Sequence, residues 1–182
     1  MLGNEALASI SLPGKIWRAY LSSSTVDAKD RIGSGPWYNA AGERIAANVA
    51  DLHNTDWRGT AQIQTQFGDP VFGPQHDVVT GSTRQGIKFT FGSTEYQRVF
   101  NEWAGSPHQF RNNANLYCQD WTSDSSSIDI LAVVGHSDWT GGIIDNLGVD
   151  DDYWNSDHLT GCDEARMIPD NGDIRIYCFA TD

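Results

Sequence analysis

The chain has 182 residues, a formal net charge of −12, and contents of 39% hydrophobic and 11% aromatic residues. This length predicts one domain, residues 1–182, with enough chain to bury a core. The acidity argues against nucleic-acid binding, which normally needs a basic patch. No apolar run reaches the roughly 18 residues of a membrane span.

Residues 1–6 lack the basic and apolar segments of a signal peptide. Two alternatives follow. Either the protein stays inside the cell, or this is an exported protein whose leader is absent from this chain.

Short periodic runs separated by Gly, Pro and Ser turns make up the first third of the chain. Residues 4–12 predict a helix that Pro13 and Gly14 end. Residues 16–21 alternate apolar and polar positions and predict a strand. The remaining predicted elements of this third are a short helix or turn (26–32), a short strand (37–39), and a helix or extended edge strand (45–52).

The rest of the chain predicts mostly loop with a few short strands. Residues 174–179 are the clearest strand, because β-formers occupy every position but one. The other predicted elements are a loop (53–75), strands (78–82, 87–91 and 128–134) and one or two helical turns (93–100).

Seven carboxylate or amide side chains crowd into residues 145–157. Ca²⁺ takes six to eight oxygen ligands, and a loop can wrap around it. The spacing does not fit the EF-hand loop, and the alternative is a solvated acidic loop with Asx turns. The calcium hypothesis uses these residues: Asp145, Asp150, Asp151, Asp152, Asn155 and Asp157.

The five histidines form neither an HxH nor an HExxH pattern. Zinc requires three or four ligands that converge, and the sequence does not show such convergence. The Gly135–Asp138 stretch is a poor catalytic triad, because neighbouring side chains point to different sides. His158 is predicted to be a surface or loop-packing residue.

Aromatic side chains in polar surroundings are candidate ligand contacts. An exposed ring stacks on a sugar or anchors a protein interface. Trp57, Trp103 and Trp154 have such surroundings, and core packing is the alternative for each. No carboxylate pair has a spacing that singles it out as a glycosidase acid pair.

Several motifs together resemble a known family. They are Trp17–Gly33, Gly35–Tyr38, Val79–Gly81, Cys118–Ser123 and Tyr177–Phe179. They occur in the same order as in the family, and the resemblance covers most of the chain. This pattern is similar to bacterial endostatin-like proteins, a lectin-like exported group that includes leptospiral outer-membrane adhesins. The resemblance implies a C-type-lectin-like α+β fold. Such a fold has two short helices, small antiparallel sheets whose terminal strands pair, and a long irregular loop region.

The resemblance also implies a disulfide between Cys118 and Cys162, which leaves Cys178 unpaired. Three reduced thiols and an intermolecular bond through Cys178 are the alternatives. Trp154–Asp157 is similar to the Trp-Asn-Asp triplet of sugar-binding C-type lectins, with an inserted Ser. The companion Glu-Pro-Asn or Gln-Pro-Asp triplet is absent, so the usual calcium-dependent sugar binding is not predicted.

These observations predict a single α+β domain that acts as a noncatalytic, adhesin-like binding module outside the cell or at its outer surface. We expect a glycan or a protein ligand at the loops of residues 140–161, with calcium as a structural ion. The alternatives are a phage or viral display protein of the same fold, a glycan-acting hydrolase and an assembly protein. The predicted ligand contacts are Trp103, Tyr153, Trp154, Asn155 and Asp157.

Overall fold

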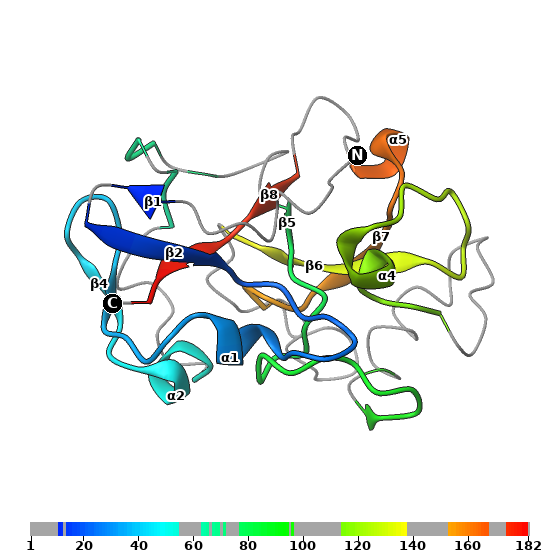
Figure 1. Ribbon diagram of the computed structural model, residues 1–182, viewed down its shortest axis with the longest axis horizontal. Helices are drawn as coiled ribbons and strands as arrows, with labels where there is room; N and C mark the ends of the chain where they lie inside the picture. The colour runs from blue at the N-terminus through cyan, green and yellow to red at the C-terminus, as the bar shows by residue number, and fades with distance from the viewer. Residues whose placement is uncertain are drawn as a thin grey trace, which may run out of the picture.

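The computed structural model describes much of the chain as an α+β domain with small sheets and short helices (Figure 1). The described residues are 11–12, 14–54, 63–65, 67–69, 71, 77–94, 96, 114–137, 153–167 and 174–181. Within these ranges, no helix has the length and apolar character that crossing a bilayer requires.

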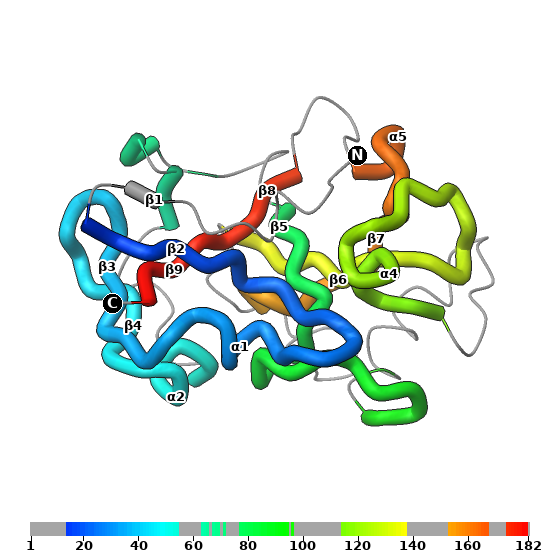
Figure 2. Tube along the Cα trace, viewed as in Figure 1, coloured from blue at the N-terminus to red at the C-terminus, as the bar shows by residue number. Residues whose placement is uncertain are grey.

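The two ends of the described chain meet in one antiparallel sheet. Its order is β1 (Ser11–Leu12), β2 (Lys15–Ala19) and β9 (Cys178–Ala180). Arg18 pairs with Phe179, and Figure 2 shows β2 and β9 running side by side. The expected pairing of an early strand with the C-terminal strand is therefore confirmed. A second, two-stranded sheet pairs β3 (Trp37–Tyr38) with β4 (Arg44–Ala46).

The largest sheet has four strands in the order β7-β6-β5-β8. Its central strand β6 (Leu131–His136) is antiparallel to both neighbours, β5 (Asp77–Val79) and β7 (His158–Gly161). The edge strand β8 (Arg175–Ile176) pairs with β5 in parallel. Five of the six residues of β6 are buried, which explains why this segment is almost continuously apolar.

Within the described ranges, four helical segments are each four residues long: α1 (Ala28–Arg31), α2 (Val49–Leu52), α4 (Cys118–Trp121) and α5 (Glu164–Met167). Asn48 caps α2 by accepting a hydrogen bond from the Asp51 N–H. The expectation of two short helices is therefore too low.

The segment α4 is a left-handed turn, with φ between 47° and 65° at all four residues. Non-glycine residues rarely adopt this conformation, so other contacts must hold it. Cys118 forms a disulfide with Cys162, Asp120 accepts hydrogen bonds from Ser24 N–H and Oγ, and the Trp121 indole donates to Ser22 O. The implied disulfide is thus present, and a loop of this length gains about 4 kcal/mol from closure.

Buried side chains form three clusters around these sheets. One is mainly aromatic and joins Tyr20, Trp37, Trp154 and Phe179. The second lies against the disulfide and includes Val79 and Val134. The third contains Phe89, Tyr96, Leu116, Leu131, Val133 and Leu159.

Three element predictions need correction. Ser11 and Leu12 are a strand and not the end of a helix; residues 4–10 of that prediction lie outside the described residues. The predicted strand 174–179 is two strands, β8 and β9, because Tyr177 separates them. Residues 87–91 form one isolated bridge, Ser82 with Lys88, and no regular strand.

Candidate functional site

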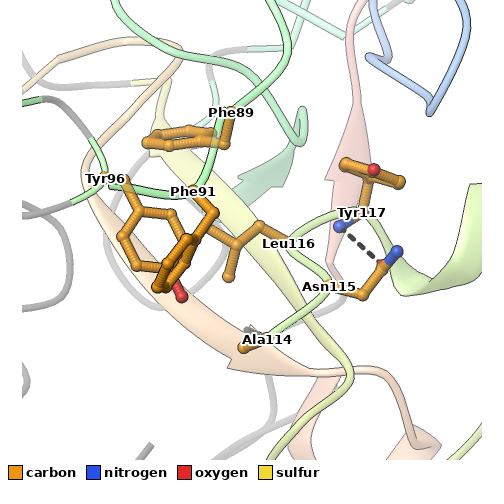
Figure 3. A pocket seen from close by; sticks show the side chains of 7 residues that line it. All are labelled: Phe89, Phe91, Tyr96, Ala114, Asn115, Leu116 and Tyr117. Atoms are coloured by element: carbon orange, nitrogen blue, oxygen red, sulfur yellow. Dashed lines mark hydrogen bonds between the residues drawn. The ribbon is translucent and has the colours of Figure 1, made fainter. Parts of the chain in front are cut away.

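A hollow of about 210 Å³, mostly aromatic at its rim, opens beside the third core cluster. We call it the aromatic hollow (Figure 3). Phe91 and Tyr96 meet edge to face at one side, with ring centroids 5.4 Å apart, and Asn115 and Tyr117 lie at the other side. The residues that line it are Phe89, Phe91, Tyr96, Ala114, Asn115, Leu116 and Tyr117.

The backbone of residues 114–117 is fixed to strand β6. Asn115 N–H donates to Asp129 O, and Leu131 N–H donates to Asn115 O at 2.7 Å. The Asn115 side-chain oxygen in turn accepts from the N–H groups of Tyr117 and Gln119. One wall of the aromatic hollow is therefore rigid, while Phe91 on the other side is 55% exposed.

Two of the predicted ligand contacts, Trp154 and Asn155, are core residues. Trp154 is 7% exposed and packs against Tyr20 at a centroid distance of 4.9 Å, and against Tyr177 at 5.2 Å. Asn155 is fully buried. Neither side chain has a surface to offer a ligand, which corrects the sequence-based prediction for these two residues.

Asn155 belongs to a buried, uncharged hydrogen-bond network with Tyr20 and His53, which we call the neutral network. The Asn155 amide donates to the Tyr20 hydroxyl at 2.8 Å and to the carbonyls of Thr83 and Arg84. The Tyr20 hydroxyl lies 2.7 Å from His53 Nε2, and His53 Nδ1 lies 2.7 Å from a backbone carbonyl, Val49 O. The Val49 carbonyl requires Nδ1–H, and in the neutral imidazole Nε2 then accepts from the Tyr20 hydroxyl. Burial lowers the pKa of His53 and raises that of Tyr20, which agrees with neutral forms.

The other predicted contacts divide between described and undescribed residues. Tyr153 lies under the guanidinium of Arg84, whose Cζ is 3.6 Å from the ring centroid. Trp103 and four residues of the calcium hypothesis, Asp145, Asp150, Asp151 and Asp152, lie outside the described residues, as do residues 140–152 of the predicted binding loop. Their roles stay predictions.

Asp157 meets two histidines and a second carboxylate; we call these four residues the His–Asp cluster. Its carboxylate oxygen Oδ2 lies 2.9 Å from His158 Nδ1 and 3.2 Å from His136 Nε2. The two imidazoles approach to 3.2 Å, from His136 Nε2 to His158 Nδ1. Asp77 lies 3.4 Å from His136 Nε2 and 3.7 Å from His158 Nε2.

Strand register explains why three of these residues share one face of the sheet. Asp77 is directly opposite His136, and Val134, two residues earlier on β6, is directly opposite His158. Opposed residues point to the same face, as do residues two apart on one strand. Asp77, His136 and His158 therefore gather where β5 and β7 begin and β6 ends.

Asp157 reaches the cluster because the chain before β7 is tied to β6 and to the core. Asp157 N–H donates to Val134 O at 2.7 Å. Thr80 Oγ1 donates to Asn155 O, and the Tyr177 hydroxyl donates to Trp154 O. Gly135 permits the approach, since a Cβ there would collide with the backbone of Trp154 and Asn155.

The carboxylates and imidazoles shift each other's pKa. Burial alone would lower the pKa of His158, but Asp157 and Asp77 outweigh it and raise this pKa to about 9. Burial alone would raise the pKa of Asp77, but hydrogen bonds with His136 and His158 lower it below its usual range. The cluster therefore favours a cation among its carboxylates.

Cys178 is a free, partly buried thiol, and burial raises its pKa.

A scan against protein-family models finds no match for this chain, and a search of curated proteins finds no sequence with significant similarity. Assignments of function therefore depend on the residues themselves.

Proposed function

We propose that this chain is a noncatalytic binding domain that recognises a glycan or a protein ligand at an outer surface through the aromatic hollow. The observation that carries the proposal is an exposed phenylalanine, Phe91, at the rim of a hollow whose opposite wall is rigid. The large hydrophobic side chains exposed in the described part of the chain are Ile16, Tyr38, Phe67 and Phe91. Of these four, Phe91 alone lines the hollow.

The size of the hollow restricts the ligand. Pockets for drug-sized ligands have volumes of roughly 300–1,000 Å³, whereas this one has about 210 Å³. It accepts one sugar ring or one side chain of a protein ligand, and the rest of the ligand would lie across the surface.

The lining suits both ligand classes. An aromatic ring stacks on the apolar face of a sugar, and an amide or phenol binds its hydroxyl groups. Phe91 and Asn115 supply a ring and an amide on the lining of one hollow, while the ring of Tyr117 packs against the second core cluster. The same groups suit the anchor residue of a protein ligand, because interface energy concentrates in aromatic contacts.

Binding to a glycan array and to a panel of immobilised extracellular-matrix proteins tests the proposal. We expect a ligand whose affinity falls about tenfold or more in Phe91→Ala, the usual loss for an interface anchor. Tyr38→Ala is a matched control, because Tyr38 is also 55% exposed and does not line the hollow. If a ligand from either panel binds wild type and Phe91→Ala with equal affinity, the aromatic hollow is not part of the ligand site.

A further inference from the structure

The His–Asp cluster lies outside the aromatic hollow, and its geometry does not fit a set of ordinary hydrogen bonds. His136 Nε2 lies 3.2 Å from His158 Nδ1 and 3.2 and 3.4 Å from carboxylate oxygens of Asp157 and Asp77. One N–H points along one direction and so satisfies at most one of these contacts well.

The distances themselves point in the same direction. Charge-assisted hydrogen bonds between nitrogen and carboxylate are roughly 2.7–2.9 Å long. Only the contact of His158 Nδ1 with Asp157 Oδ2, at 2.9 Å, lies in that range. The other contacts, at 3.2–3.7 Å, are longer.

These separations are those of ligand atoms around one small ion. A tetrahedral ion with ligands at about 2.0–2.1 Å holds neighbouring ligand atoms about 3.3 Å apart. Four contacts among Asp77 Oδ1, His136 Nε2, Asp157 Oδ2 and His158 Nδ1, at 2.9, 3.2, 3.2 and 3.4 Å, bracket this value, whereas Asp77 approaches His158 through the other ring nitrogen, Nε2, at 3.7 Å. Ligand atoms of Asp77, His136 and His158 all lie within 4.8 Å of one another.

We propose that Asp77, His136, Asp157 and His158 form a four-ligand site for a divalent transition-metal ion of the zinc class. Two carboxylates and two neutral imidazoles carry a charge of −2, which a dication neutralises. Imidazole nitrogen suits zinc, copper, nickel and iron, whereas calcium prefers a shell of oxygens.

The site is enclosed yet reachable. The side chains of His136 and Asp157 are each 12% exposed, while Asp77 and His158 are 21% and 26% exposed. An ion can therefore enter from the side of Asp77 and His158 and finish with four protein ligands. Four protein ligands are typical of structural zinc sites, whereas catalytic sites keep one position for water. The ion would tie together the ends of β5, β6 and β7.

Direct metal titration of the full chain, after removal of metal with a chelator, tests the site. We expect calorimetry with zinc chloride to give one ion per chain with a Kd of micromolar or below. His136→Gln and His158→Gln each remove a ligand and should weaken zinc binding by more than about 100-fold, since changes beyond the ligand shell alone cost roughly 10–100-fold. Near-UV circular dichroism of the metal-free variants verifies that each is folded.

Asp151→Asn is the control for the calcium hypothesis, because Asp151 is a predicted calcium ligand and is not one of the four proposed zinc ligands. It should leave zinc affinity unchanged. A loss of zinc in Asp151→Asn together with retention in His136→Gln would overturn the proposal, and so would an absence of zinc binding by the wild type.

Cobalt substitution tests the coordination without any variant. A cobalt ion bound by four nitrogen and oxygen ligands should give the intense visible absorption of tetrahedral Co²⁺. The weak spectrum of six-coordinate cobalt would contradict a four-ligand site. Displacement of zinc by an equal concentration of calcium would contradict the metal class.

Discussion

The short segment from Tyr153 to His158 contributes to two polar clusters, one uncharged and one negatively charged. Asn155 enters the neutral network, which is buried and uncharged, and each of its amide contacts is between 2.8 and 3.2 Å. Asp157 enters the His–Asp cluster, which is partly exposed, negatively charged and more loosely spaced. In the neutral network the Asn155 amide nitrogen bonds to protein groups while Asn155 Oδ1 is buried without a hydrogen-bond partner, whereas the His–Asp cluster places two carboxylates next to two imidazoles.

This difference separates a role in folding from a role in binding. A buried polar network with its hydrogen bonds made stabilises one arrangement of the chain. Clustered carboxylates repel each other until a proton or a metal ion neutralises them. Variants and conditions that affect one cluster and spare the other therefore test whether this division is correct.

Gly135→Ala should have the largest effect, because it disturbs both clusters. The new Cβ would collide with the backbone of Trp154 and Asn155, which cannot rotate away as a side chain can. We expect a loss of about 3 kcal/mol or more in the free energy of unfolding by urea, at the upper end for overpacking, and weaker zinc binding.

Gly42→Ala controls for the general cost of replacing a glycine. It has φ of +81° and no neighbouring atom within 4 Å of the added Cβ. Its expected cost is only the roughly 1–2 kcal/mol of the left-handed conformation. Equal losses of unfolding free energy in the two variants would show that a Cβ at residue 135 does not collide with the Trp154 backbone.

Asn155→Ala should affect the neutral network alone. It removes the amide that donates to the Tyr20 hydroxyl and to the carbonyls of Thr83 and Arg84. Each buried acceptor that loses its donor costs about 1–3 kcal/mol, so we expect a total loss of about 3 kcal/mol at constant zinc affinity.

Asp157→Asn is the counterpart for the other cluster. It keeps the shape of the side chain but removes a negative charge next to His136 and His158. We expect a smaller loss of stability in the metal-free protein and a large loss of zinc affinity. If Asn155→Ala weakens zinc binding as much as Asp157→Asn does, the two clusters act as one unit.

Zinc binding should stabilise the wild type by slightly less than the amount that Gly135→Ala or Asn155→Ala destabilises it. An ion at 100 times its dissociation constant adds about 2.7 kcal/mol, which for a chain of this size raises Tm by about 5–10 °C. Thermal unfolding with zinc and with chelator measures the shift, and His136→Gln should abolish it. A shift that survives in His136→Gln would place the ion elsewhere.

The sequence predicts local features of this molecule better than the convergence of distant residues. The strand β2 (Lys15–Ala19), predicted at residues 16–21, and the strand that contains Phe179 follow from local patterns, and the Cys118–Cys162 disulfide follows from the family resemblance. Trp154, in contrast, has polar neighbours in sequence and aromatic neighbours in space. A local pattern does not encode which side chains surround a residue in the fold.

The His–Asp cluster was missed for the same reason. Asp77, His136 and His158 begin or end three strands that are far apart in sequence, and their meeting depends on register. Asp157 was predicted as a metal ligand, but with the acidic residues beside it and not with histidines. The sequence feature that points to the cluster is a histidine or aspartate at one end of each of three apolar strands. If those strands are neighbours in one sheet, these side chains can meet.

The pH dependence of metal-free stability distinguishes the two clusters by sign. Burial lowers the pKa of His53 below 6.5, so its contribution is present above pH 6.5 and is lost as pH falls. Asp157 and Asp77 outweigh burial and raise the pKa of His158 to about 9, so its contribution is present below pH 6.5 and is lost as pH rises through 9. Urea unfolding from pH 5 to 10 should therefore show a maximum, and NMR titration should assign each limb to its imidazole. His53→Gln should reduce only the loss of stability at acid pH, and His158→Gln only the loss at alkaline pH. The reverse result would contradict a neutral His53 and a protonated His158 in the folded, metal-free protein.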